Sequence, residues 1–384
     1  MSNAVPAAIE PVSRPKGKAE DQVEEGVGLA VSGGSYRAML FHLGAFLRLH
    51  ELGLLRQIDR ISSVSGGSIT AAKIALEWDR LDGRDAFFRH VVAPVRKLAG
   101  TTIDWTSTAA GIFLPGYVAD RISAQYRKHL FGDATLQDLP DEPAAPRFVI
   151  NASNLETGAL WRFSKPYMGD WKLGRVMKPT VSLADAVTAS SAFPPVLSPF
   201  VLQVDKEDFE KPTAGLDPRF FDEISLTDGG VYDNLGLETV WKNYRTVLVS
   251  DAGAANALDP SPAGNWASLA KRVLDIVHEQ VSSIRKRQVI ASYQLPEGDE
   301  GHRRGAYWGI RTDIRNYKLD DALDAPLERT RELAATPTRL KRLGSAHQER
   351  LINWGYAVCD AGVRKHWPPA DGPGRAFPYP DIEV

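Results

Sequence analysis

A serine in a turn of small residues is the first side chain of this sequence that could support chemistry. Ser65 lies in the segment Ser63-Val64-Ser65-Gly66-Gly67, between a short apolar run (58–64) and a segment with helical spacing (69–78). A nucleophile elbow needs small neighbours, because the turn is sharp and the hydroxyl must project clear of the backbone. The usual pattern is G-x-S-x-G, and Ser63 stands here at the first glycine. A plain small-residue turn before a helix is the structural alternative.

A glycine loop ahead of this serine could bind a negative charge. Gly33-Gly34-Ser35-Tyr36-Arg37-Ala38 follows an apolar run and opens a helical segment, so its backbone N–H groups could face a phosphate or a tetrahedral oxyanion. It lacks the lysine of a P-loop, and it keeps only the first glycine of the dinucleotide fingerprint. Taken alone, the loop leaves nucleotide binding, oxyanion binding and a tight turn open.

An aspartate follows another short apolar run, in Thr227-Asp228-Gly229-Gly230. An aspartate before glycines often makes an Asx-type turn. The same position is a carboxylate at the end of a strand, where the active sites of α/β sheets lie. Asp228 is therefore a candidate base.

The elements around these motifs indicate the fold class. The pattern predicts a strand at 27–31 and a helix at 36–52 closed by Gly53, then a strand at 58–64 and a helix at 69–78. Two strand–glycine turn–helix units in succession are typical of a parallel α/β sheet. No linker divides the chain.

Further elements are expected downstream. Strands are predicted at 147–152, 159–163, 224–227, 246–250 and 307–310, and helices at 183–189, 266–292 and from 329 onward. The long helix at 266–292 has an apolar stripe formed by Leu269, Val273, Ile276, Val277, Val281 and Ile284.

Taken together, the three motifs resemble the patatin-like phospholipase family over roughly residues 26–255. Gly33–Ala38 is similar to its G-G-G-x-R-G loop, 63–67 to its G-x-S-x-G, and Asp228-Gly229-Gly230 to its D-G-G/A. The segment 189–195 also resembles the family segment between serine and aspartate. Three positions depart from the pattern by adding a Cβ where the family has glycine: Ser35, Ala38 and Ser63.

The resemblance implies a Ser–Asp dyad without a histidine. Ser65 would attack an acyl ester, and Asp228 would take its proton. The backbone N–H groups of Gly33, Gly34 and Ser35 would form the oxyanion hole. The remaining motif residues, which would support the site, are Arg37, Gly67 and Gly230. Arg37 could steady the loop, meet an anionic head group, or form a surface ion pair.

The resemblance also implies a three-layer α/β/α fold around a central, mostly parallel sheet. The expected organisation is a disordered tail at 1–24, a catalytic core at 25–255, and a helical extension at 256–384 packed on the core. The function expected is that of a lipolytic serine acyl hydrolase of the phospholipase A or lysophospholipase type.

The amino-acid composition limits the classes of partner that this protein could bind. Lys and Arg number 46 and Asp and Glu 48, a net charge of −2, which argues against nucleic-acid binding. The single cysteine, Cys359, allows no disulfide, and no metal-binding motif occurs, so no metal or cofactor is expected. No signal peptide or transmembrane run is found. A cytoplasmic protein is expected, with an acyl-ester or lipid substrate and a peripheral membrane surface as partner.

Three other functions stay open at this stage. An α/β-hydrolase triad needs a late histidine, and four qualify by order: His278, His302, His347 and His366. A nucleotide-binding regulator could use the 33–38 loop, and a catalytically dead scaffold could keep the fold.

Two segments could meet lipid. The charge-poor segment 105–117 could be an interfacial surface, a lid or a core helix. The basic run 285–287 could attract anionic lipid or complement the dipole of a helix C-terminus.

Overall fold

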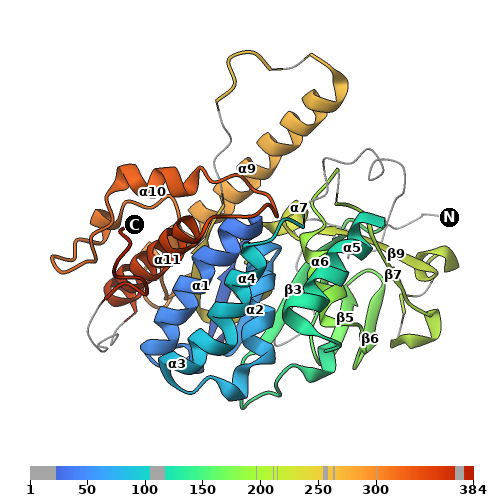
Figure 1. Cartoon of the computed structure of the whole chain (residues 1–384). Helices are drawn as coiled ribbons and strands as arrows, with labels where there is room; N and C mark the ends of the chain where they lie inside the picture. The colour runs from blue at the N-terminus through green and yellow to red at the C-terminus, as the bar shows by residue number, and fades with distance from the viewer. Residues whose placement is uncertain are drawn as a thin grey trace.

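The computed structural model places a mixed sheet at the centre of the chain (Figure 1). It describes residues 23–103, 117–195, 197–210, 212–213, 215–253, 258–262, 264–299, 301–367 and 376–384. The strands are β1 (Glu24–Val31), β2 (Arg60–Val64), β3 (Arg147–Asn154), β4 (Leu160–Phe163), β5 (Tyr167–Asp170), β6 (Gly174–Met177), β7 (Phe200–Gln203), β8 (Phe209–Glu210), β9 (Glu223–Asp228), β10 (Tyr244–Asp251) and β11 (Tyr307–Gly309).

Helices of the described residues cover the sheet, and three of them lie in the C-terminal third. They are α1 (Ser35–Glu51), α2 (Gly66–Leu76), α3 (Gly83–Phe87), α4 (Ala93–Ala99), α5 (Tyr117–Tyr126), α6 (Leu183–Ser191), α7 (Gly230–Asp233), α8 (Glu238–Trp241), α9 (Trp266–Gln294), α10 (Leu327–Ala334) and α11 (Ser345–His366). The tail predicted at 1–24 lies almost entirely outside the described residues, as does the segment 105–117.

The sheet has a parallel half and an antiparallel half. Its order is β11-β10-β1-β2-β3-β4-β5-β6-β8, with β9 pairing β3 and β7. The strands β11, β10, β1, β2 and β3 are parallel, and the pairings beyond β3 are antiparallel. The predicted α/β class is confirmed. The parallel half brings the carboxyl ends of β1, β2 and β10 to the same end of the sheet. At this end the glycine loop follows β1, and Ser65 follows β2.

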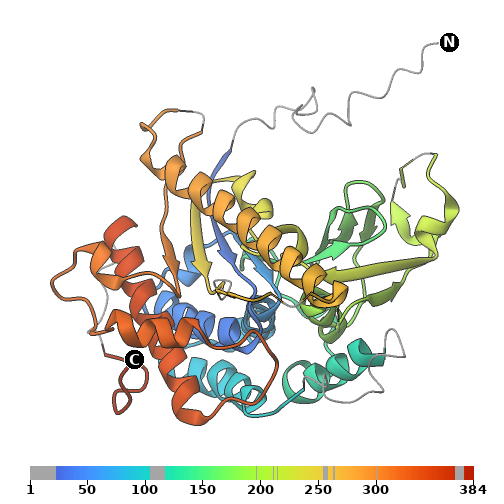
Figure 2. The same ribbon diagram turned by 90° about the horizontal axis from the view of Figure 1, so that it is seen from above.

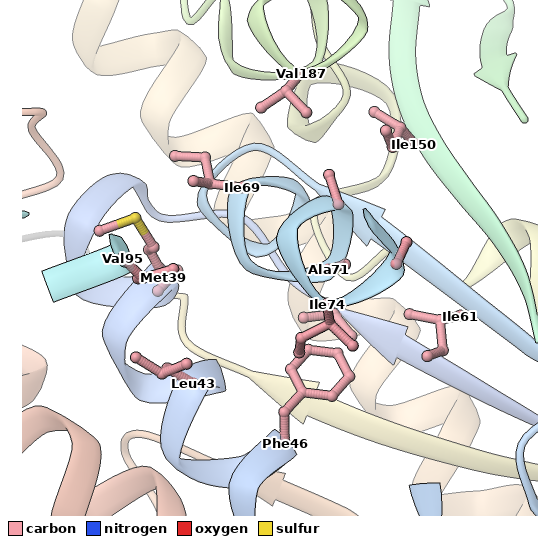
Figure 3. Packing of buried hydrophobic residues seen from close by; sticks show 14 of the residues in the cluster. Met39, Leu43, Phe46, Ile61, Ile69, Ala71, Ile74, Val95, Ile150 and Val187 are labelled. Atoms are coloured by element: carbon pink, nitrogen blue, oxygen red, sulfur yellow. The ribbon is translucent and has the colours of Figure 1, made fainter. Parts of the chain in front are cut away.

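Side chains of the central strands alternate between two cores. On β1, Leu29 and Val31 join the large cluster, which includes α1 and α2, while Ala30 joins a smaller cluster with Val240 of α8 and Val289 of α9. Strand side chains point alternately to opposite faces, so both faces of this strand are covered. Figure 3 shows the large cluster, where residues of α1 such as Phe46 meet residues of α2 such as Ile74.

The C-terminal third is built into the same body. β11 adds a strand beside β10, and α11 crosses α1 where glycines allow backbone contact. A Cβ on Gly44 would lie 1.9 Å from the Ile352 carbonyl oxygen, and one on Gly355 would lie 1.8 Å from that of Phe41. Arg48 and Asp360 form a buried ion pair at 2.8 Å between these helices.

The long helix α9 is oriented with its apolar stripe outward. Figure 1 shows its N-terminal part projecting from the rest of the molecule, and Figure 2 shows the helix crossing over it. The basic run 285–287 lies within this helix and not in its last turn. Arg285 and Lys286 are half-buried and form ion pairs with Asp233 and Asp251, respectively. These two residues therefore neither attract anionic lipid nor complement the dipole of a helix C-terminus.

Over the part of the chain that the structure describes, none of the helices is long and apolar enough to span a bilayer.

Candidate active site

Ser65 occupies a strained turn between β2 and α2. Its backbone has φ 50° and ψ −120°, in the positive-φ region that L-residues rarely adopt. Its N–H donates to the hydroxyl oxygen of Ser190 at 2.9 Å, and the residue is 5% exposed. The geometry is that of a nucleophile elbow, with the side chain at the N-terminus of α2.

Two glycines after Ser65 are required by close backbone contacts. A Cβ on Gly66 would lie 2.1 Å from the carbonyl oxygen of Ser35. A Cβ on Gly67 would lie 2.6 Å from the carbonyl oxygen of Ser32. The elbow therefore packs directly against the glycine loop, and no side chain fits between the two segments.

The serine that replaces the first glycine of the elbow has hydrogen-bond partners. Ser63 donates its hydroxyl to the carbonyl of Val149 at 3.3 Å and accepts from the Ser68 hydroxyl at 3.0 Å. The Ser68 and Ser190 hydroxyls lie 2.9 Å apart. Ser63 belongs to β2, where the backbone conformation suits an L-residue. The replacement of the first glycine by Ser63 therefore causes no backbone strain.

Asp228 ends β9 and contacts Ser65 directly. Its carboxylate accepts the N–H of Gly230 at 2.7 Å and the hydroxyl of Ser65. Burial raises the pKa of Asp228 to about 7, although both hydrogen bonds favour the ionised form. A carboxyl with this pKa can accept a serine proton near neutral pH far better than one at the ordinary value.

Replacement of Asp228 by Asn is expected to stabilise the fold, and increasingly so at higher pH. Between the unfolded pKa near 3.8 and the folded pKa of about 7, the folded state keeps a proton that the unfolded state loses. Wild-type stability therefore falls as pH rises through this window, whereas Asn does not titrate. We expect Asp228→Asn to melt about 2–5 °C above wild type at pH 8, with the difference fading toward pH 4.

Differential scanning fluorimetry across pH 4–8 checks this expectation. Asp320→Asn, at an exposed carboxyl, serves as the control and should show no such pH trend. A difference that stays constant with pH would contradict the raised pKa of Asp228.

The glycine loop places two N–H groups beside the elbow. The N–H of Gly33 already donates to the carbonyl of Asn234 at 3.0 Å, so the predicted oxyanion role of Gly33 does not fit this structure. Among the described residues, the N–H groups of Gly34 and Ser35 have no hydrogen-bond partner. Gly34 has φ 143° and Ser35 φ 53°, so the departure at Ser35 places an L-residue at a positive φ. The departure at Ala38, inside α1, carries no such strain.

Arg37 holds the loop to distant parts of the chain. The side chain is 1% exposed, so it forms no surface ion pair and is not free to meet a head group. It donates to the carbonyl of Ala252 at 3.1 Å, to that of Thr336 at 2.5 Å and to the hydroxyl of Thr338 at 2.9 Å. Of the three expected roles, the contacts favour steadying of the loop.

Two residues at the site were not predicted as site residues from sequence. Ser190 lies in the family-like segment 189–195, but its contact with the Ser65 N–H spans 125 positions. Asn234 accepts the Gly33 N–H, and its side-chain oxygen lies close to Gly33 and Gly230. The only early signal for Asn234 was its nearness in sequence to Asp228.

Of the four histidines that a triad could use, only His278 lies beside the segment that holds Asp228 and Gly230. Its ring is hydrogen-bonded to the backbone of Gly230 and packs edge-on against Phe193, with ring centroids 6.4 Å apart. Burial lowers its pKa, so the ring is neutral at pH 7. The other three have partners elsewhere: His302 with the Leu295 carbonyl, His347 with the Thr336 hydroxyl and His366 with the Tyr317 ring.

No cluster of three or more His, Cys, Asp or Glu residues within the described ranges is placed to hold a metal ion.

Comparisons with known proteins place this site in a family. The family model described as patatin-like phospholipase matches residues 29–241. The structure of human GIVD cytosolic phospholipase A2 aligns with a TM-score of 0.54 at 12% identity, covering 89% of this chain and 62% of that one. VipD from Legionella pneumophila aligns with a TM-score of 0.37 at 15% identity, covering 90% of this chain and 67% of that one. No curated protein matches the chain in sequence.

The family match covers more than half of the chain and includes all three motifs. The human structure supports the fold, and the chain spans about three fifths of the length of that protein. The predicted family and three-layer α/β fold are confirmed. The chain belongs to the patatin-like phospholipase family.

Proposed function

We propose that the protein is a lipolytic serine acyl hydrolase of the phospholipase A or lysophospholipase type, acting through a Ser65–Asp228 dyad. The observation that carries the proposal is the placement of Ser65, in a strained elbow, beside a buried carboxyl whose pKa is raised to about 7. A catalytically dead scaffold would not need a strained serine kept in contact with a poised base.

The reaction follows from this contact. Ser65 Oγ attacks the ester carbonyl carbon while its proton passes to Asp228. The N–H groups of Gly34 and Ser35 stabilise the oxyanion, and the N-terminus of α2 adds to the positive potential. Collapse releases the alcohol, which takes the proton back from Asp228, and leaves an acyl-enzyme. Asp228 then takes a proton from a water molecule whose oxygen attacks the acyl carbon. Collapse breaks the bond to Ser65 Oγ, which takes the proton back from Asp228, and the fatty acid is released.

The hydroxyl groups near the dyad hold Ser65 in position, but they do not form a proton relay. Ser190 holds the N–H of Ser65, and Ser68 contacts Ser190. The neutral ring of His278 bonds the backbone of Gly230, while Asp228 itself bonds Ser65. This arrangement favours direct proton transfer over a Ser–His–Asp chain.

A fluorophosphonate probe tests the proposal. Attack by an activated serine on phosphorus expels fluoride and leaves a stable phosphonyl ester. We expect peptide mass spectrometry to find the label on Ser65 alone, with labelling increasing between pH 6 and pH 8 as Asp228 ionises. Labelling of a different serine, or none in a protein that remains folded, would contradict the proposal.

A further inference from the structure

The helix α9 presents an apolar face to the outside. At 100° per residue, its exposed large apolar side chains fall on one side of the helix. They define the outer face: Trp266 (83% exposed), Leu269 (49%), Val273 (52%), Ile276 (46%), Val277 (53%) and Ile284 (56%), with Ile290 (39%) at its margin. An amphipathic helix of a globular protein normally turns such a face toward the core. Here the arrangement is reversed.

The opposite side of α9 is held to the body by polar groups. Lys286 pairs with the buried Asp251 at 2.6 Å, and Arg285 contacts Asp233 at 3.5 Å. Although burial would raise it, the pKa of Asp251 is held below its ordinary value by Lys286. The hydroxyl of Tyr293 donates to a carbonyl of β10 at 2.6 Å. Rotating the outer face inward would break these buried contacts, so its exposure is built into the fold.

The same helix reaches the active site. His278 faces inward and bonds the backbone of Gly230, whose N–H donates to Asp228. Val277, the preceding residue, belongs to the outer face. Since a helix is about 10–12 Å across with its side chains, a surface in contact with the outer face would lie about one helix diameter from the dyad.

The charges beside the outer face suit phospholipid head groups. The exposed polar residues that share this side of the helix are Gln280, Arg287, Gln288 and Gln294. None is acidic, and Arg287 is a cation. The carboxylates of Asp275 and Glu279 lie on other sides of the helix. A face with large apolar side chains, a tryptophan near one end and a basic residue near the other is typical of helices that lie in a membrane interface.

We propose that the outer face of α9 docks the protein on the surface of a phospholipid bilayer, so that the dyad meets its substrate there. The inference rests on the proposed lipolytic function for its purpose, although docking can be measured without turnover. The helix would lie in the plane of the interface with its apolar side chains among the acyl chains, and with its polar side still fixed to β10 and α7.

A triple variant tests this surface. Val273→Gln, Val277→Gln and Ile284→Gln together make the outer face polar at exposed positions. The matched control is Leu155→Gln, Trp171→Gln and Met177→Gln, which changes three exposed apolar residues of the β3–β6 region (52%, 63% and 46% exposed). Binding to vesicles of phosphatidylcholine and phosphatidylglycerol is measured by flotation, together with the ratio of turnover on vesicles to turnover on a soluble p-nitrophenyl ester.

We expect the α9 variant to lose at least tenfold in vesicle binding and in the activity ratio, with the control within about twofold of wild type and both melting near wild type. Unchanged vesicle binding by the α9 variant would overturn the proposal. So would a change from dimer to monomer in light scattering without loss of vesicle binding, which would assign the face to a second copy. Vesicle binding that depends on the outer face, in a protein without esterase activity, would refute the proposed function alone.

Discussion

Ser65→Ala should reduce ester hydrolysis at least a thousandfold while the melting temperature stays within about 3 °C of wild type. The substitution deletes the attacking oxygen, and the oxyanion donors and substrate contacts that remain cannot form an acyl-enzyme. The stability change is small because one hydroxyl is removed from a turn whose backbone is held by Ser190 and by contacts with the glycine loop. Initial rates on p-nitrophenyl butyrate, with a melt of the same preparation, measure both.

Ser68→Ala is the matched control for this result. Ser68 lies one turn later on α2, where its N–H donates to the Ser65 carbonyl at 2.9 Å, and its hydroxyl is linked to Ser65 through Ser190. We expect it to keep activity within about tenfold of wild type. If Ser65→Ala still turned over substrate, or if Ser68→Ala were equally inactive in folded protein, the assignment of the nucleophile would be wrong.

Asp228→Asn should lose activity to the same degree as Ser65→Ala, and the double variant should lose little more. Asn keeps the shape and can still accept the Gly230 N–H, but it cannot take a proton. Two residues that act as one unit give effects that do not add. Turnover and fluorophosphonate labelling of Ser65 are the two measurements, and both should fall together.

His278→Gln provides the contrast, because His278 is the histidine that contacts the site. If Asp228 acts directly, this variant should keep activity within about tenfold and should still be labelled. The same is expected of Gln at His302, His347 and His366. A folded His278→Gln protein that is inactive and unlabelled would favour a triad and would overturn the dyad.

The glycine loop and the serine turn could be predicted from the sequence because backbone sterics determine both. Gly66 must be glycine to meet the backbone of Ser35, and this requirement is visible as a pattern of small residues. The strand–turn–helix units around residues 33 and 65 follow from apolar runs ended by glycine. These local rules also predicted α9 to within a few residues.

Contacts between distant segments could not be predicted in this way. Arg37 bonds Thr336, which lies 299 positions away, and no local rule selects that partner. The sequence likewise gives no indication that the Gly33 N–H donates to the Asn234 carbonyl. For α9, periodicity defines an apolar face but not its direction, which here depends on ion pairs such as that of Lys286 with Asp251.

The pairing of β10 with β1 has a consequence for how the chain can be divided. The family match ends at residue 241, before β10 begins, so a fragment cut there would leave β1 as the edge of the sheet. Its unpaired N–H and C=O groups, beside a row of Val and Leu side chains, would offer a template for pairing between molecules. Arg37 would also lose its acceptors on Thr336 and Thr338, which would leave its positive charge without these hydrogen bonds. A fragment cut at the end of the family match would thus carry all three motifs together with an aggregation-prone edge.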